Sequence, residues 1–335
     1  MKDKIRLELE KLIDPSLKMS LKQSEGIKHI GYDEDHDLVT LIIAIGKKSD
    51  QAERSLRMDV TKLIKQTLGH KGLKLEIEEN KKIESITKGK CTFIGIASGK
   101  GGVGKSTVVV NIANRLMKKG HKVGIIDADI YGSSIPKLLN VPHEFPHYDE
   151  NQKIAPITYQ TMQVISTEFF TNPKEPVIWR GGMLHSMLEH FFYDVAWDKE
   201  LEYMLIDLPP GTGDVMLDVK SYIPQAKMII VTTPHLSASH VAIKAGFAAL
   251  KLDHQILGVI ENMSYYKNPI NGQRENIFGE GGGLEVSKLL GAELLAQIPI
   301  DQPKNHPAIF DIDEDNGKLY DDIADLIIFN EVDYD

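Results

Sequence analysis

The stretch Ile94–Thr107, IGIASGKGGVGKST, guides the interpretation of the rest of the chain. Its first residues are apolar and typical of a buried strand, and the residues that follow, Val108–Leu116, carry apolar side chains at helical spacing. Between them, the glycine-rich segment Gly99–Thr107 fits the pattern G-x-x-x-x-G-K-[ST]. A strand, a glycine-rich loop and a helix in this order form the context that a phosphate-binding loop requires. The alternative is a glycine-rich turn that precedes a helix by chance.

The residue types of this loop suit a nucleoside triphosphate. Glycines let backbone N–H groups approach an anion closely, and the N-terminus of the following helix adds partial positive charge. We expect Lys105 to reach the β- and γ-phosphates and the Ser106 hydroxyl to bind Mg²⁺. The predicted nucleotide-binding residues of the loop are Gly99, Lys100, Gly101, Gly102, Val103, Gly104, Lys105, Ser106 and Thr107.

Composition predicts a globular, cytoplasmic protein. The 335 residues suggest two domains or one large domain, and an apolar content of 42% is ordinary for a globular chain. The net charge of −9 disfavours general attraction to nucleic acid or anionic membrane, although a local basic patch is compatible with it. No apolar run approaches the ~18 residues of a membrane-spanning helix, and residues 1–17 lack the apolar core of a signal peptide. The acidic stretch 311–335 argues further against a membrane partner, because anionic lipid would repel it.

Residues 1–80 predict a small α+β domain. The expected elements are a helix over Ile5–Ile13, strands at Ile27–Tyr32 and Leu38–Ile45, a helix over Ala52–Leu68 and a strand at Leu73–Ile77. Residues 81–91 are polar and lysine-rich and are interpreted as a linker, with a solvated helical extension as the alternative. The chain's single cysteine, Cys91, ends this segment, and we expect a buried, inert thiol there.

Residues 92–335 predict an α/β domain with a doubly wound, mainly parallel sheet, because short apolar runs alternate with helical patterns. Further strands are expected at Val123–Ile126, Tyr203–Ile206, Met228–Val231, Ile256–Ile260 and Leu294–Ile298. Helices are expected at Val108–Lys119, Met183–Tyr193, Ser237–Lys251, Leu284–Leu290 and Lys318–Ile328. A second glycine-rich segment, Gly279–Gly283, lacks the Lys-Ser pair and is interpreted as a flexible turn.

Acidic residues follow two of these strands, at the sheet edge where ligands of parallel sheets bind. Asp207 closes an apolar strand in the Walker B pattern and is expected to hold Mg²⁺, with a capping role in a rigid Pro-Pro turn as the alternative. Asp127 and Asp129 are spaced by one residue beside the phosphate loop, a pattern that favours a switch over a helix cap or turn. We expect Asp127 to support the Mg²⁺ shell, so the predicted metal set is Ser106, Asp127 and Asp207.

The second lysine of the loop carries a more specific resemblance. GKGGVGKS resembles the deviant phosphate loop of the MinD/ParA/nitrogenase-iron-protein ATPases. The resemblance implies that ATP is the nucleotide and that the chain forms a homodimer in which Lys100 reaches the partner's nucleotide. It also implies that Asp129 orients the attacking water, so that Lys100, Lys105 and Asp129 are the catalytic residues, and that Asn262 hydrogen-bonds adenine. A solvated lysine and a strand-end asparagine remain the alternatives for Lys100 and Asn262.

Four longer stretches resemble the Mrp/ApbC family of P-loop ATPases, namely 127–134 (DADIYGSS), 179–181 (WRG), 207–214 (DLPPGTGD) and 261–266 (ENMSYY). The resemblance implies an iron–sulfur cluster carrier or scaffold that binds and slowly hydrolyses ATP as a homodimer. The element order of residues 1–80 resembles the MIP18-like (DUF59) domain found in front of many family members. Members that carry a cluster have a CxxC after the ENMSY-like stretch, whereas residues 261–283 contain no cysteine. In this the chain is similar to the cysteine-lacking, SalA-like branch, and an iron–sulfur cluster as cofactor is uncertain.

Two functions of different classes therefore stay open. The first is iron–sulfur cluster handling in the manner of the family, which the overall resemblance favours. The second is an ATP-gated regulatory adaptor or DNA-binding protein without a cluster, which the missing cysteines favour. Beside a second copy of the chain, the expected partners are a client protein, at a surface near residues 262–283, or DNA.

Overall fold

The computed structural model describes residues 2–15, 20–22, 24, 26–34, 36–45, 49–79, 91–130, 132–171, 181–211, 214–223 and 225–332. The chain divides into two compact units, Met1–Glu84 and Ser85–Asp335, which are treated separately. Apart from Cys91, the linker expected at 81–91 lies outside the described residues. So do 179–180 and 212–213, which contributed to the family resemblance.

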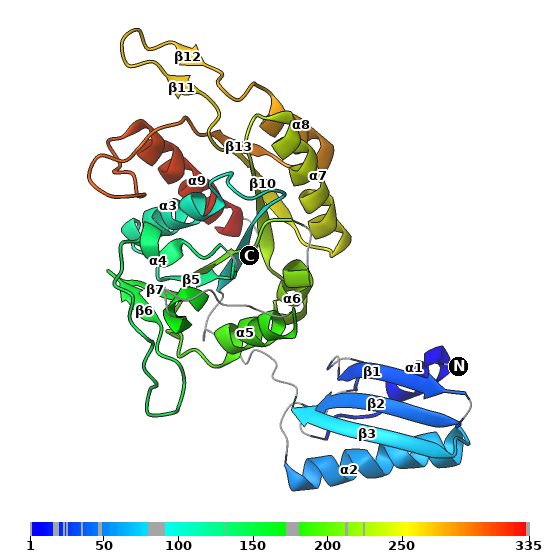
Figure 1. The fold of residues 1–335 in the computed structure, drawn as a ribbon. Coiled ribbons are helices and arrows are strands. Elements are labelled where there is room, and N and C mark those ends of the chain that lie inside the picture. Colours follow the sequence, from blue (N-terminus) through cyan, green and yellow to red (C-terminus); the bar gives the residue numbers. More distant parts are fainter. Residues whose placement is uncertain are drawn as a thin grey trace. The chain divides into compact units, whose positions relative to one another are not determined.

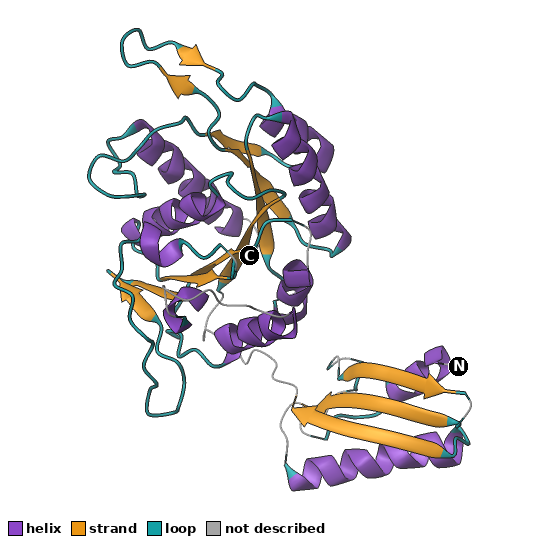
Figure 2. Cartoon of the chain, viewed as in Figure 1, coloured by secondary structure: helices purple, strands orange, loops and turns teal. Residues whose placement is uncertain are grey.

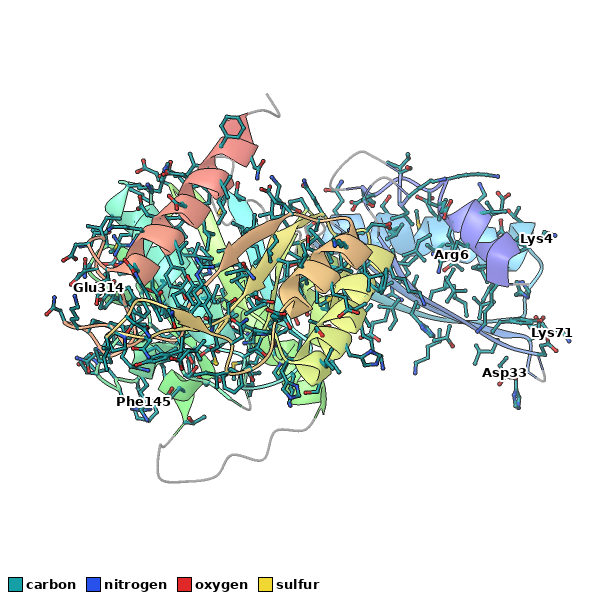
Figure 3. All side chains as sticks on the ribbon, turned by 90° about the horizontal axis from the view of Figure 1, so that it is seen from above. Lys4, Arg6, Asp33, Lys71, Phe145 and Glu314 are labelled. Atoms are coloured by element: carbon teal, nitrogen blue, oxygen red, sulfur yellow. The ribbon has the colours of Figure 1, made fainter. Side chains whose placement is uncertain are left out.

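The first unit is a three-stranded sheet with helices packed on it (Figures 1 and 2). Its elements are α1 (Lys2–Leu9), β1 (Ile27–Asp33), β2 (Leu38–Ile45), α2 (Asp50–Thr61), a π-helical continuation over Lys62–Thr67, and β3 (Gly72–Glu79). β1 pairs with β2 antiparallel and β2 pairs with β3 in parallel. Apolar side chains from the strands and both helices share one core, whereas Lys4, Arg6, Asp33 and Lys71, labelled in Figure 3, are exposed.

Several boundaries in this unit differ from the sequence-based expectation, among them the end of α1 and the start of α2. α1 ends at Leu9, four residues before the expected end, because the chain turns there and Ile13 instead forms an isolated bridge with Ser20. α2 begins at Asp50, two residues earlier than expected. Its N-cap is Ser49, whose hydroxyl oxygen accepts a hydrogen bond from the backbone N–H of Ala52 at 3.2 Å.

The second unit is built on an eight-stranded sheet in the order β13-β10-β9-β4-β8-β5-β7-β6. The strands are β4 (Thr92–Ser98), β5 (Val123–Asp127), β6 (Ile157–Tyr159), β7 (Met162–Ser166), β8 (Tyr203–Asp207), β9 (Lys227–Thr232), β10 (Ile256–Glu261) and β13 (Leu294–Gln297). The strands pair in parallel, with the exception of β6, which runs antiparallel to β7. This confirms the α/β class with a mainly parallel sheet.

Helices cover both faces of this sheet (Figure 1). The larger ones are α3 (Lys105–Lys118), α5 (Gly181–Tyr193), α6 (Asp214–Tyr222), α7 (Leu236–Lys251), α8 (Gly282–Leu290) and α9 (Asp315–Val332), and α4 (Ile135–Leu138) is a single turn. α3 and α9 lie together on one face, and α7 and α8 lie together on the other (Figure 1). β5 and β8 are buried along their whole length and β9 from its second residue on, which explains their continuous Val, Ile and Leu runs.

The sequence pattern did not predict two features of this unit, a small hairpin and the packing of the acidic C-terminal stretch. A small hairpin, β11 (Tyr266–Lys267) with β12 (Arg274–Glu275), extends beyond the sheet (Figure 1) and had not been expected. The acidic C-terminal stretch is largely the packed helix α9, where Asp321 and Asp325 each lie 2.8 Å from Lys119 of the α3 end. Among the helices the model describes, none combines the length and apolar character needed to cross a bilayer.

Candidate nucleotide-binding site

The phosphate loop occupies residues 99–104 between β4 and α3, at the carboxyl edge of the sheet. α3 begins at Lys105, so Ser106 and Thr107 lie in its first turn. The N-cap of α3 is Gly104, whose φ of 80° places it in the left-handed region. A Cβ at this position would also collide with the side-chain amide of Asn262. The loop therefore has, at Gly104, a backbone conformation that suits glycine, and glycine-rich loops of this kind let N–H groups approach an anion.

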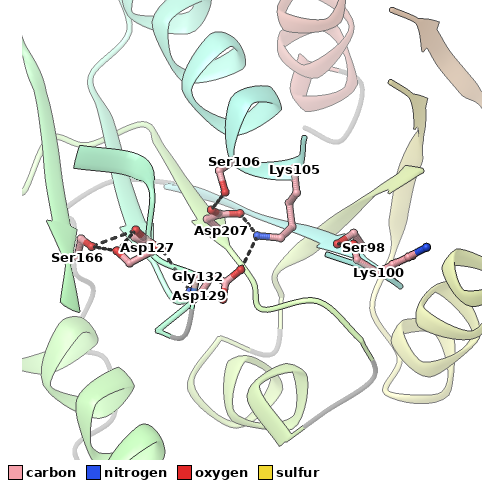
Figure 4. A network of polar contacts seen from close by, with 10 residues as sticks. Ser98, Lys100, Lys105, Ser106, Asp127, Asp129, Gly132, Ser166 and Asp207 are labelled. Atoms are coloured by element: carbon pink, nitrogen blue, oxygen red, sulfur yellow. Dashed lines mark hydrogen bonds and ion pairs between the residues drawn. The ribbon is translucent and has the colours of Figure 1, made fainter. Parts of the chain in front are cut away.

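Lys105 and Ser106 converge on one buried acid, Asp207, at the end of β8 (Figure 4). The ammonium of Lys105, only 6% exposed, contacts Oδ1 of Asp207 and lies 3.5 Å from Oδ2 of Asp129. The hydroxyl of Ser106 donates to Oδ2 of Asp207 at 2.5 Å. Both oxygens of Asp207 thus contact the first turn of α3. A bound triphosphate would compete with Asp207 for the same ammonium group.

Asp127 lies beside Asp207 in the sheet, because the two residues are register partners on β5 and β8. Its carboxylate is fully buried, and Oδ2 accepts hydrogen bonds from the hydroxyls of Ser133 at 2.7 Å and Ser166 at 3.0 Å. Burial, together with the nearby charge of Asp207, raises the pKa of Asp127 to about 7. Burial also raises the pKa of Asp207, and the adjacent ammonium of Lys105 counteracts that rise.

Asp129 is held by its own loop. Its backbone N–H donates to Oδ1 of Asp127 at 3.2 Å, and its own Oδ1 accepts from the N–H of Gly132 at 3.1 Å. The remaining oxygen, Oδ2, faces Lys105 (Figure 4). The sequence-predicted residues Lys105, Ser106, Asp129 and Asp207 are therefore brought together in one cluster, with Asp127 next to it.

The two other predicted residues lie at the margins of this cluster. Asn262, after β10, donates from Nδ2 to the backbone oxygen of Val103 at 2.9 Å, so its amide contacts the phosphate loop. Lys100 is exposed and directed away from Lys105 and Asp207 (Figure 4), with Nζ 3.5 Å from the hydroxyl of Ser237 on α7. The adenine contact expected of Asn262 and the partner contact expected of Lys100 stay predictions.

Three polar residues of this region had no predicted role. Ser133 and Ser166 hold Asp127, as described above. The third is Glu261, a buried residue at the end of β10, whose Oε1 accepts from Ser264 at 2.6 Å and Gln297 at 2.8 Å. Glu261 and Ser133 lie within the stretches that carry the family resemblance, whereas Ser166, at the end of a separate strand, belongs to no motif. Its proximity to Asp127 follows from the register of the two strands alone.

The second glycine-rich segment corrects one expectation. Oε2 of Glu261 accepts from the backbone N–H of Gly283 at 2.5 Å, and Gly282 and Gly283 are buried as the first residues of α8. The interpretation of 279–283 as a flexible turn is therefore wrong for its second half. The physical reason is that a buried carboxylate binds the helix N-terminus and fixes it to β10.

The donor set of the cluster fits a magnesium nucleotide. Ser106 and Asp207 supply oxygen ligands, which Mg²⁺ prefers, and the glycine loop with Lys105 supplies N–H and ammonium donors for phosphate. Among the described residues, no group of three or more His, Cys, Asp and Glu side chains is arranged to hold a metal ion. Cys91, the single cysteine of the chain, is half-buried directly before β4.

Comparisons with known proteins show which family and which fold this chain resembles. The family model described as NUBPL iron-transfer P-loop NTPase matches residues 90–319. An iron–sulfur cluster carrier protein of Bacillus subtilis is 38% identical over 343 residues and covers 97% of each chain. A nucleotide-binding protein of Archaeoglobus fulgidus, solved in complex with ADP, is 34% identical with a TM-score of 0.53, covering 71% of this chain and 88% of that one. The cell division protein MinD of Aquifex aeolicus shares the fold, at 21% identity and a TM-score of 0.50, covering 71% and 98%.

Proposed function

Because the chain belongs to the iron–sulfur cluster carrier family of P-loop NTPases, we propose that it is a homodimeric, Mg²⁺-dependent ATPase that acts as a nucleotide-driven switch. The observation that carries the proposal is the convergence of Lys105 and Ser106 on the buried carboxylate of Asp207. A buried lysine at the start of a helix, directly after a glycine-rich loop, is the arrangement that a triphosphate requires.

Each residue of the cluster has a defined task in this proposal. Lys105 exchanges its carboxylate contacts for the β- and γ-phosphates, which carry more negative charge. Ser106 and Asp207 would hold Mg²⁺, which would supply positive charge against the charge that develops on the phosphates, and Asp127 would support these two residues from the neighbouring strand. Asp129, whose Oδ2 faces the phosphate-binding lysine, orients the attacking water.

Lys100 supports the dimeric part of the proposal. Its ammonium is exposed and directed away from the Lys105 cluster of its own chain, so it is available to a nucleotide bound by a second copy. Lys100→Ala is therefore expected to leave ATP binding by the single chain intact and to abolish ATP-dependent dimerisation, measured by light scattering with and without ATP. A variant that dimerises like the wild type would contradict this role.

A client surface near residues 262–283 follows from the contacts of β10. Asn262 touches the phosphate loop at Val103, and the adjacent Glu261 binds both Ser264 and Gly283, the two ends of the hairpin segment. The hairpin segment exposes Ile270, Ile277 and Phe278. We propose that rearrangement of the phosphate loop on ATP binding is transmitted through these two residues to the hairpin.

Whether the switch can carry an iron–sulfur cluster depends on the cysteines of the chain. Relatives named iron–sulfur cluster carrier proteins motivate cluster handling as the function of the cycle. This chain has one cysteine, and residues 261–283 contain none, so a cluster carried here cannot rest on a CxxC in that segment. A dimer would contribute two Cys91 thiols. We therefore propose a carrier-family switch whose cluster ligation, where it occurs, uses Cys91 and ligands from a partner.

Anaerobic reconstitution with iron and sulfide, with and without ATP, tests the cargo. A stable iron–sulfur absorption band that is lost in Cys91→Ser supports carriage. Its absence, together with ATP-dependent and salt-sensitive retention on DNA, supports the regulatory function instead.

Asp129→Ala tests the enzymatic part. The variant is expected to bind ATP with unchanged affinity and to lose turnover, because the water is no longer oriented. Full turnover in this variant would remove Asp129 from catalysis, and hydrolysis by the wild type that persists in EDTA would contradict the Mg²⁺ dependence.

A further inference from the structure

Three neighbouring strands of the second unit end in polar residues at the same level of the sheet. Asp127 at the end of β5 is the register partner of Asp207 on one side and of Ser166 on the other. Ser166 closes β7, a strand that contributes nothing to the phosphate loop. The row Ser166, Asp127, Asp207 therefore connects the nucleotide cluster to a strand that the motif does not include (Figure 4).

Ser166 and Ser133 make a closed triangle of contacts with Asp127. The two hydroxyl oxygens lie 2.6 Å apart, and both lie within 3.0 Å of Oδ2 of Asp127. Ser166 is fully buried, and its oxygen also accepts from the backbone N–H of Glu168 at 3.2 Å. That contact directs its hydroxyl proton toward Asp127 or Ser133.

The same carboxylate determines where Asp129 lies. Oδ1 of Asp127 accepts the backbone N–H of Asp129, while Oδ2 is bound by Ser133, four residues further along the loop. The loop that carries Asp129 is thus attached to Asp127 on both sides. Ser166 comes from outside residues 127–133, and its place is fixed by the strand β7.

We propose that Ser166 is a positioning residue for ATP hydrolysis. Its hydroxyl holds Asp127 and Ser133 in place, and through them it keeps Oδ2 of Asp129 directed at the phosphate-binding lysine. The proposal rests on the proposed function, in which Asp129 orients the attacking water. It requires no change in nucleotide affinity, because the hydrogen bonds of the Ser166 hydroxyl connect it to Asp127, Ser133 and Glu168, which lie outside the phosphate loop.

The test compares Ser166→Ala with Ser239→Ala in the full-length chain. Ser239 is an equally buried serine on α7, outside the cluster, and its hydroxyl donates to the backbone oxygen of Leu236. Ser166→Ala is expected to lower kcat about tenfold, the scale of a small misplacement of a reacting group, with ATP affinity within about twofold of the wild type. Ser239→Ala is expected to keep both values. Ser133→Ala should resemble Ser166→Ala, and the double variant should fall short of the product of the two effects.

A second measurement separates positioning from loss of a structural bond. In the Asp129→Ala background, Ser166→Ala is expected to leave the residual single-turnover rate unchanged, because it acts through Asp129. Hydrogen exchange at the amides of Asp129 and Gly132 should rise in Ser166→Ala. Wild-type kcat in Ser166→Ala, or an equal fall of the rate in both backgrounds, would overturn the proposal. A wild-type chain without ATP hydrolysis would instead overturn the proposed function.

Discussion

Two glycine-rich segments precede helices at the same edge of the sheet, but the N-termini of these two helices have different partners. α3 and α8 are both N-capped by a glycine with φ of 80°, Gly104 and Gly281. The residues that end and follow β10 contact both segments, since Asn262 bonds Val103 beside the first and Glu261 bonds Gly283 in the second. The second helix carries its own anion, a buried carboxylate. The first carries a lysine and a serine and leaves its loop N–H groups for an external anion.

This difference explains why the loop before α3 can bind a ligand, whereas the loop before α8 is a fixed connection between β10 and the helix. A helix N-terminus attracts an anion wherever one can reach it. At α8 the anion is covalently part of the chain, so the contact fixes β10 to the helix. At α3 the nearest carboxylate, Asp207, pairs with Lys105 and Ser106 instead of the loop amides. The following predictions test this contrast, from the largest expected effect to the smallest.

The largest effect is expected for Lys105→Ala. Loss of the ammonium removes charge-assisted contacts to two phosphates, and ATP affinity should fall by at least about 100-fold. Isothermal titration with ATP and Mg²⁺ measures this. Lys118→Ala, an exposed lysine on the same helix, is the matched control and should bind like the wild type.

Removal of Lys105 also leaves Asp207 buried without its cation, so the folded state of the variant has to be verified by thermal unfolding. Unchanged ATP affinity in a folded Lys105→Ala variant would refute the assignment of the loop.

Glu261→Gln is expected to affect stability and not nucleotide affinity. The amide nitrogen places a donor where Glu261 now accepts from three donors, which should lower the free energy of unfolding by about 2–3 kcal/mol. Chemical denaturation measures the loss, and Glu285→Gln, an exposed acid in the first turn of α8, is the control. A large fall in ATP affinity in a stable Glu261→Gln variant would show that the two loops are not separate in function.

Asn262→Ala sharpens the contrast at the first loop. Loss of the hydrogen bond to Val103, and of the predicted contact to adenine, should weaken ATP binding about tenfold and GTP binding less. Competition titrations with both nucleotides distinguish the two contributions, with Asn268→Ala on the exposed hairpin as control. An equal loss for ATP and GTP would leave Asn262 as a support of the loop without an adenine contact.

The smallest effect is expected at Gly281. Gly281→Ala meets no atom within 4 Å, so the cost is backbone strain alone, about 1 kcal/mol of unfolding free energy. The same change at Gly104 adds the collision with Asn262 and should cost clearly more, with weaker ATP binding. Equal costs in denaturation experiments would contradict the description of the first loop as the more confined one.

The sequence predicted the central sheet because strands buried on both faces consist of continuous apolar residues, as in Val123–Asp127 and Tyr203–Asp207. It missed β6 and β7 at the sheet edge, where short strands such as Ile157–Tyr159 have mixed exposure and no such run. Two motifs placed Lys105, Ser106 and Asp207 correctly in one cluster, since Lys105 and Ser106 end the phosphate loop and Asp207 closes a parallel strand at the same edge of the sheet.

The serine contacts of Asp127 could not be predicted in the same way. Ser133 and Ser166 are 33 residues apart and meet only because β5 and β7 align in a particular register. Register depends on pairing across the whole sheet, which local patterns do not determine. The same holds for Glu261, whose three donors come from Ser264, Gly283 and Gln297.

Ser264 and Gly283 both donate hydrogen bonds to one carboxylate, and this has a practical consequence for protein engineering. Because both ends of the hairpin are tied at a single point, the length and sequence between them are not dictated by the sheet. We expect a peptide inserted at the exposed turn around Gly272 to leave the nucleotide-binding cluster undisturbed, because the two ends of the hairpin are already held together beneath it. The chain thus offers an acceptor site at which a reporter or an affinity module can be grafted onto the hairpin.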